Sequence, residues 1–134
     1  DRTKDIEKTF KFALNSGFLA ANFNILTPYP GTRLFTSLKE NDRLIDEKWW
    51  LTGEYNNVWF KPSKIEKNEL LIKSSRAKWK FYKYRYILRR AIKNPSANLS
   101  SLKEALIYFV FNKALHDEQA KRQREIRKKY QLST

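Results

Sequence analysis

The spacing of apolar and polar residues changes twice early in the chain, and each change predicts a new element. Four apolar residues recur three or four positions apart and predict a helix over residues 3–16: Ile6, Phe10, Ala13 and Leu14. Residues 18–26 then form a nearly continuous apolar run, typical of a strand covered on both faces, and predict a strand over 19–26. Helical spacing returns at Leu34, and Thr32 is placed to cap a helix over residues 32–41.

The second half of the chain carries two longer helical patterns. Ser63 and Glu66 form a capping box at the start of the first, which predicts one continuous helix over residues 64–93. Its apolar stripe consists of Leu70, Ala77, Phe81, Tyr84, Leu88 and Ala91. Such a helix would span about 45 Å at its usual rise per residue. We therefore expect it to protrude, to bend or to lie against something larger.

A second helix is predicted over residues 101–127. Asn94 and Pro95 end the first pattern, and Ser101 with Glu104 caps the next. The apolar positions of this helix are Leu102, Ala105, Leu106, Phe109 and Val110. We expect the two long helices to pair as an antiparallel hairpin. Between the two halves of the chain, the residues around Val58 predict a short strand near 56–60.

The sequence FNILTPYPGT at residues 23–32 runs from the predicted strand into a stiff corner. Pro28 and Pro30 fix their own φ angles and push the residues before them toward extended conformations. Gly31 permits a positive φ angle or the close approach of another group. In an α/β protein such a corner lies at the carboxyl end of a strand, where ligands usually bind. The prolines explain the turn without a ligand as well, so a ligand-binding corner and a rigid connector are both open.

Composition excludes several kinds of chemistry from these 134 residues. The chain has no cysteine, which excludes disulfides, thiolate nucleophiles and cysteine-held metal clusters within it. Its one histidine, His116, is expected to be solvated or to cap a helix rather than to bind a metal. No apolar run approaches the roughly 20 residues that cross a bilayer. We expect a soluble, cytoplasmic chain and, because it contains no methionine, a fragment of a longer protein.

The whole net charge of +14 lies in the second half of the chain. Residues 1–60 carry eight basic and eight acidic residues, whereas residues 61–134 carry twenty and six. The basic residues alternate with Trp79, Phe81, Tyr82, Tyr84 and Tyr86. They form either a surface for nucleic acid or the solubilising outer face of a packed helix. A basic amphipathic helix also suits an anionic lipid surface, so an independent module that binds nucleic acid or a membrane from the periphery is one interpretation of the chain.

A set of residues in the first half, read together, resembles a known family. The set consists of residues 27–32 (TPYPGT), Leu34, Phe35, Leu38, Arg43, Trp49 and Trp50. With the preceding apolar strand, it is similar to the end of the barrel in radical S-adenosylmethionine (radical SAM) enzymes of the cobalamin-binding type. A looser similarity to a carboxyl-terminal extension of that family continues through residues 58–62 and along the long helix that ends at Leu88-Arg89-Arg90.

This resemblance implies a fold and a parent enzyme. The fold would be α+β and predominantly α, with a βα piece of a partial TIM-type barrel in residues 1–54 and a long two-helix basic extension in residues 55–134. The parent would be an oxidoreductase or methyltransferase with a [4Fe–4S] cluster held by three cysteines outside this chain. It would use S-adenosylmethionine, and cobalamin is a further cofactor of the family. The chain would complete and buttress the barrel and would be inactive alone.

The resemblance also implies candidate binding residues along the late strand and the corner. Asn24, Leu26, Tyr29, Pro30 and Gly31 are expected to line the cofactor or substrate cavity of the parent. Neither a catalytic residue nor a metal ligand is expected within the chain. Its partner would be the remainder of the parent protein, and the apolar strand at 19–26 would favour self-association of the isolated chain.

Overall fold

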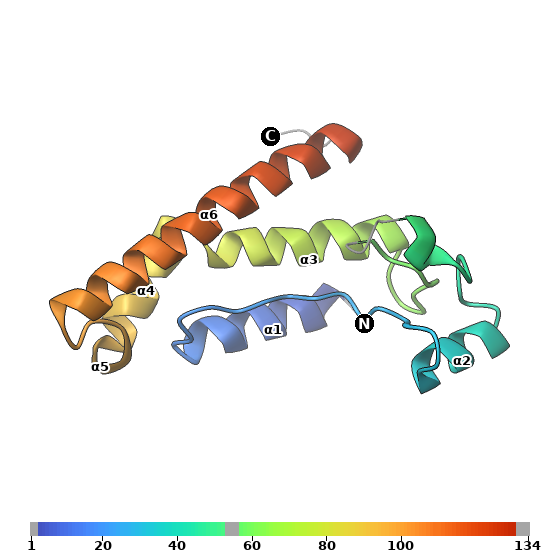
Figure 1. The fold of residues 1–134 in the computed structure, drawn as a ribbon, viewed down its shortest axis with the longest axis horizontal. Coiled ribbons are helices and arrows are strands. Elements are labelled where there is room, and N and C mark those ends of the chain that lie inside the picture. Colours follow the sequence, from blue (N-terminus) through green and yellow to red (C-terminus); the bar gives the residue numbers. More distant parts are fainter. Residues whose placement is uncertain (1–2, 53–56, 131–134) are drawn as a thin grey trace.

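The structure is a computed structural model that describes residues 3–52 and 57–130. Figure 1 shows an elongated arrangement in which α1 and α6 both lie along α3. In chain order the helices are α1 (Thr3–Asn15), α2 (Arg33–Glu40), the 3-10 helix η1 (Trp49–Thr52), α3 (Lys67–Phe81), α4 (Tyr84–Lys93), α5 (Pro95–Asn98) and α6 (Leu102–Tyr130). After α1, an extended segment returns along α1 and α3 toward α2 (Figure 1).

The prediction of an α+β fold with a βα piece of a TIM-type barrel is wrong. The described ranges contain helices and one isolated antiparallel bridge between Leu44 and Phe60, but no strand and no sheet. Residues 19–26 are extended, yet no second extended segment of the described chain lies beside them to form a ladder of hydrogen bonds. Of the short strand predicted near 56–60, only the bridge at Phe60 is formed, and residue 56 lies outside the described residues.

Three predicted helix ends, which depend on residues close in sequence, are confirmed. The Thr32 hydroxyl oxygen accepts a hydrogen bond from the Phe35 N–H at 3.2 Å, so α2 begins as predicted. Ser101 caps α6 in the same way, accepting from the Glu104 N–H at 3.2 Å. Gly17 has a φ angle of +68°, the left-handed conformation that commonly follows the end of a helix such as α1.

The continuous helix predicted over residues 64–93 is instead two helices, α3 and α4. The first begins at Lys67 because Glu66, rather than Ser63, caps it. The Glu66 carboxylate accepts hydrogen bonds from the N–H groups of Asn68 and Glu69, at 3.1 and 3.2 Å. A carboxylate at this end also interacts favourably with the helix dipole.

The carboxyl end of α3 is held by side chains from later in the chain. The buried guanidinium of Arg90 donates a hydrogen bond to the carbonyl oxygen of Phe81. Nδ1 of His116 lies 2.7 Å from the carbonyl oxygen of Tyr82, and because a carbonyl only accepts, Nδ1–H is the donor. These contacts satisfy carbonyl groups that a continuous helix would have used internally. His116 thus caps a helix, one of the two roles predicted for it.

The break between α3 and α4 changes which residues of the predicted apolar stripe are buried. Tyr84 and Leu88 belong to that stripe but are about half exposed, at 52% and 50%. Ile87 is buried instead, and its carbonyl oxygen accepts a hydrogen bond from the Tyr108 hydroxyl of α6 at 2.8 Å. The bend is therefore how a helical pattern of this length fits a small chain, and α6 returns along α4 and α3 as the expected hairpin partner (Figure 1).

The main apolar core lies between α1 and α3 and is rich in aromatic rings. Its centre is Phe10 of α1 and Phe81 of α3, and Phe23 of the extended segment contacts both, with ring centroids 6.4 and 5.8 Å away. A second cluster lies toward α2 and consists of Leu38, Val58, Phe60, Leu70 and Leu71. Both clusters join the first half of the chain to the second.

Candidate functional site

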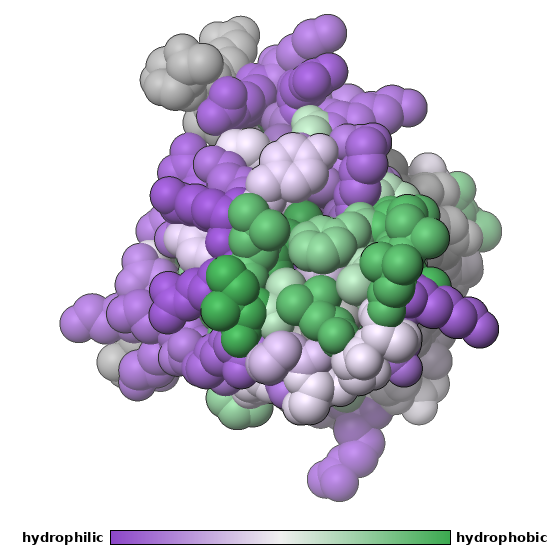
Figure 2. Space-filling model, turned by 90° about the vertical axis from the view of Figure 1, so that its left-hand side faces the viewer, coloured by the Kyte–Doolittle hydropathy of each residue, from purple (hydrophilic) through white to green (hydrophobic). Residues whose placement is uncertain are grey.

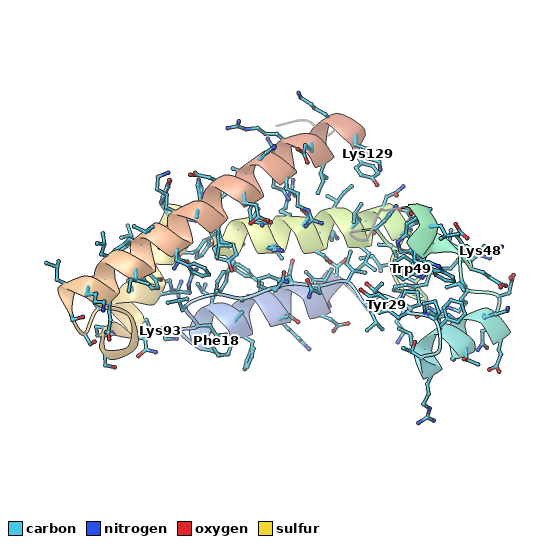
Figure 3. The ribbon with its side chains drawn as sticks, in the orientation of Figure 1. Phe18, Tyr29, Lys48, Trp49, Lys93 and Lys129 are labelled. Atoms are coloured by element: carbon cyan, nitrogen blue, oxygen red, sulfur yellow. The ribbon has the colours of Figure 1, made fainter. Side chains whose placement is uncertain are left out.

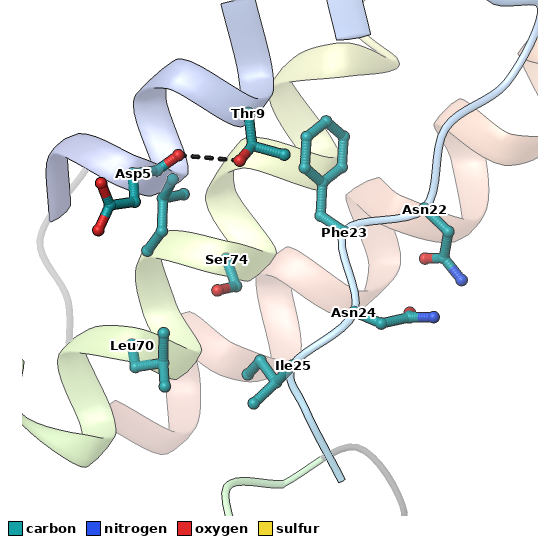
Figure 4. A pocket seen from close by; sticks show the side chains of 9 residues that line it. Asp5, Thr9, Asn22, Phe23, Asn24, Ile25, Leu70 and Ser74 are labelled. Carbon is teal, nitrogen blue, oxygen red and sulfur yellow. Dashed lines mark hydrogen bonds between the residues drawn. The ribbon is translucent and has the colours of Figure 1, made fainter. Parts of the chain in front are cut away.

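The candidate site is the extended segment at residues 21–27 and the grooves on its two sides. Its residues alternate in burial as those of a β-strand do. The half-buried positions are Ala21, Phe23, Ile25 and Thr27, and the exposed positions are Asn22, Asn24 and Leu26. Figure 4 shows the side chains of Phe23 and Ile25 directed toward α1 and α3 and those of Asn22 and Asn24 directed away from them.

One buried side chain anchors the start of this segment. The Tyr82 hydroxyl donates to the Ala21 carbonyl oxygen at 2.9 Å and accepts from the Ala21 N–H at 3.1 Å. Burial raises the pKa of Tyr82 above its ordinary value, so the hydroxyl keeps the proton that it donates. Beyond Ala21, residues 22–26 make no backbone-to-backbone hydrogen bond within the described chain. The Ile25 carbonyl oxygen accepts from the Thr27 hydroxyl at 3.3 Å, and the other backbone groups of this stretch leave both of its edges open.

The proline corner that follows is a packed structural element. The carbonyl oxygen of Pro28 accepts a hydrogen bond from the Trp49 indole N–H at 2.9 Å, and both residues are buried. The Trp49 ring stacks on Trp59, with centroids 6.0 Å apart and planes at 21°. Tyr29 contacts the Trp49 ring by its edge at 5.4 Å, as the labelled side chains in Figure 3 illustrate. The proline corner thus packs with Trp49 and Trp59 in one cluster.

A second contact holds the turn after α2 in place. The Arg43 guanidinium donates two hydrogen bonds to the Lys61 carbonyl oxygen, at 3.0 and 2.8 Å. The ring of Phe35 lies 6.3 Å from that of Trp50. The residues that carry the family resemblance therefore pack against one another and act first as a structural unit.

The larger groove, of about 750 Å³, lies between the extended segment, α3 and α6. Two cations, Lys78 and Arg122, line it together with the amide groups of Asn24 and Asn57. Burial lowers the pKa of Lys78 below its ordinary value, and the positive charge of Arg122 lowers it further. Because both cations face one groove, an anionic or strongly polar group is the ligand chemistry that it suits.

The structure brings together some of the predicted binding residues but not all of them. Asn24, Leu26 and Tyr29 line the larger groove, whereas Pro30 and Gly31 line neither groove and are exposed. Gly31 is needed for its φ angle of +78° alone, because a Cβ there would meet no atom within 4 Å. The smaller groove, of about 260 Å³, lies on the α1 side and is the one drawn in Figure 4.

Sequence reasoning missed the cations of the groove. Lys78 and Arg122 lie in different helices, and no motif distinguishes them from the many other basic residues around them. Their shared position is set by the packing of α6 on α3, where the Gln123 side-chain amide donates to the Ser75 hydroxyl at 2.6 Å. Such a long-range contact leaves no local signal.

Three further findings bear on the classes of function considered. In the described ranges, no group of three histidine, cysteine, aspartate or glutamate residues could hold a metal ion. None of the helices described is both long enough and apolar enough to cross a membrane. Phe81 and Tyr82 are buried, so two of the aromatic rings considered for stacking on nucleobases are inaccessible.

The chain was compared with protein-family models, with curated proteins and with solved structures, and no match was found in any of the three. The resemblance to radical SAM enzymes therefore stays a prediction.

Proposed function

We propose that the chain is the carboxyl-terminal part of a radical SAM iron–sulfur enzyme of the cobalamin-binding type, where it braces the parent protein and is inactive alone. The observation that carries this proposal is the stretch at residues 22–26, which has no backbone-to-backbone hydrogen bond on either edge within the described chain. Backbone groups next to an apolar core are rarely left without partners. The open edges support a role in which the rest of the parent supplies those partners.

The side chains of this stretch support the same role. Phe23 and Ile25 already pack on the helices, so they fix the rotation of the segment about its own axis. A polypeptide segment in this state can add to the edge of another protein's sheet, gaining main-chain hydrogen bonds. We infer that this chain fixes the orientation of the segment and that the parent supplies the main-chain hydrogen-bond partners.

The larger groove also supports the proposal, because it could form part of a cavity shared with the parent. Asn24, Leu26 and Tyr29 would form part of the wall of a cavity shared with the parent, opposite Lys78 and Arg122. The two cations suit an anionic group of a cofactor or substrate. Pro30 and Gly31 would serve by turning the chain behind that wall.

The iron–sulfur cluster itself does not fit this chain. The chain has no cysteine, and the described residues contain no group of three histidine, aspartate or glutamate side chains that could hold a metal ion. In the proposed assembly, the parent supplies every protein ligand of the cluster. No catalytic step is therefore assigned to a residue of this chain.

The first experiment examines the longer protein from which the chain would come. We expect its reading frame to encode a C-x-x-x-C-x-x-C triplet upstream of Asp1. We expect the longer protein to turn brown after anaerobic reconstitution with iron and sulfide and, once reduced, to cleave S-adenosylmethionine. A reading frame without the triplet, or a protein that stays colourless, would overturn the proposal.

The second experiment tests the open edge directly. Asn24→Pro removes one backbone N–H from the extended segment, and Asn24→Ala is the matched control that keeps it. In the isolated chain this N–H has no backbone partner, so we expect the two variants to have the same stability within about 0.5 kcal/mol. In the longer protein, Asn24→Pro should lower stability by about 1–3 kcal/mol more than Asn24→Ala. Equal effects in the longer protein would contradict pairing of this edge.

A further inference from the structure

One end of the molecule exposes a group of large aliphatic side chains. This apolar tip is formed by α4 and the first half of α6, and its members are Leu88, Ile92, Leu102, Leu106, Ile107 and Val110. Their exposed fractions run from 50% for Leu88 to 89% for Leu102. Figure 2 views the molecule from this end and shows apolar surface gathered at its centre with hydrophilic side chains around it. Exposed apolar surface of this kind marks an interaction site.

The rotation of α6 about its axis keeps these side chains on the outside. Tyr108 and Asn112 are the buried residues on this half of the helix, and both are fixed by polar contacts. The Tyr108 hydroxyl bonds to α4, and Asn112 Oδ1 accepts from Arg90 at 2.7 Å. A rotation of α6 that buried Leu106 would break both hydrogen bonds and would leave the buried guanidinium of Arg90 without its Asn112 partner. The exposure of the tip is thus a stable property of the fold.

The charges around the apolar tip select the kind of partner. Arg85, Arg89 and Lys93 of α4 and Lys103 of α6 are exposed. Lys93 also donates to the Asn15 carbonyl oxygen at 2.8 Å. Glu104 is the sole acidic residue in the sequence from 83 to 113. A second copy of the chain would bring like charges together, which disfavours a symmetric dimer through this surface. An apolar surface with a basic rim is complementary to an apolar surface with an anionic rim.

We propose that the apolar tip docks on an anionic lipid bilayer, with the aliphatic side chains below the headgroups and the basic side chains among them. The tip lies at one end of an elongated molecule, so a flat surface can reach it without contacting α1 or α2 (Figure 1). Nucleic acid suits it less well, because the aliphatic side chains that make up the tip do not stack on bases. This inference does not rest on the proposed function.

The test is co-sedimentation of the 134-residue chain with lipid vesicles. We expect partition into phosphatidylcholine vesicles that contain about 30 mol % phosphatidylserine to be at least about tenfold stronger than into pure phosphatidylcholine. Ile92→Ser with Leu106→Ser should weaken that partition by at least about tenfold. Leu51→Ser is the matched control, because Leu51 is 73% exposed but lies in η1, away from the apolar tip. Circular dichroism of each variant checks that the helices are intact.

Each alternative has its own outcome. Absence of partition into anionic vesicles at low salt, or an equal loss with Leu51→Ser, would overturn the proposal. So would binding to duplex DNA or RNA that is tighter than binding to vesicles and insensitive to Ile92→Ser with Leu106→Ser. A dimer that these serine substitutions abolish, without any vesicle binding, would show that the tip serves a second copy of the chain.

Discussion

Replacement of Arg90 is the most direct test of how α3, α4 and α6 are held together. Its guanidinium is fully buried, donates to the Phe81 carbonyl oxygen and to Asn112 Oδ1, and lies 3.8 Å from the centre of the Phe81 ring. Arg90→Met keeps most of the aliphatic stem but removes both donors. Each buried acceptor left without its donor costs about 1–3 kcal/mol. Loss of the contact with the ring costs about 1 kcal/mol more.

Removal of the buried charge offsets part of this loss of stability. A buried charge has a desolvation cost of several kcal/mol, and methionine has none. The lowered pKa of Arg90 has burial as its main cause, which shows the direction of that cost. We therefore expect Arg90→Met to lower the free energy of unfolding by about 3 kcal/mol. With a urea m-value of about 2 kcal/mol per molar, the unfolding midpoint should fall by about 1.5 M.

The assay is urea unfolding followed by helical circular dichroism. Arg89→Met is the matched control, because Arg89 is adjacent but exposed, and it should change stability by less than about 0.5 kcal/mol. Combining Arg90→Met with Asn112→Leu should cost at least about 1 kcal/mol less than the sum of the single effects. If the Arg90 and Arg89 variants are equally stable, or if the double variant is additive, the account of this contact is wrong.

Two further predictions concern other buried groups. Trp49→Phe removes the donor to the Pro28 carbonyl oxygen and should lower the free energy of unfolding in urea by about 2–3 kcal/mol. The half-buried Trp50 is the control, and Trp50→Phe should cost about 1 kcal/mol or less. Equal losses would contradict the role of this hydrogen bond in the proline corner. Burial raises the pKa of Tyr82 and Tyr108, so the folded chain keeps both protons at a pH where the unfolded chain releases them. Their contribution is complete below about pH 10 and is lost as pH rises above it, which makes stability fall. The Tyr82→Phe, Tyr108→Phe variant should show a shallower fall across that range, and an unchanged slope would refute this assignment.

The helices that the sequence predicted correctly depend on local contacts. α1 and α2 follow from apolar spacing and from residues that act within one turn, such as Thr32 and Gly17. The start of α6 follows from Ser101 in the same manner. These signals act between neighbours in sequence, so no knowledge of tertiary packing is needed to use them.

The errors involve partners that are distant in sequence. Residues 19–26 have the apolar character of a strand, but a strand also needs a neighbour, and the described chain supplies none. The apolar stripe continues in phase through Tyr84 and Leu88, so the spacing gives no warning that α3 stops at Phe81. That stop depends on Arg90 and His116, whose contacts form only when the helices pack.

In the candidate site, too, the residues close together in sequence were predictable and those distant in sequence were not. Asn24, Leu26 and Tyr29 were predicted because they belong to one recognisable segment, and they share a groove. Lys78 and Arg122 reach that groove from two helices that are far apart in sequence. A pattern read along the chain cannot bring them together, since only the packing of α6 on α3 does so.

The dependence of early elements on later ones has a consequence for synthesis. A ribosome exports α1, the extended segment and α2 before it has made α3, the helix that covers Phe10, Ala13 and Leu14. Even then, α3 has no defined end until Arg90 and His116 emerge. Until α3 and the residues that hold its end are made, the apolar face of α1 stays exposed, so aggregation of the nascent chain competes with its folding during that interval.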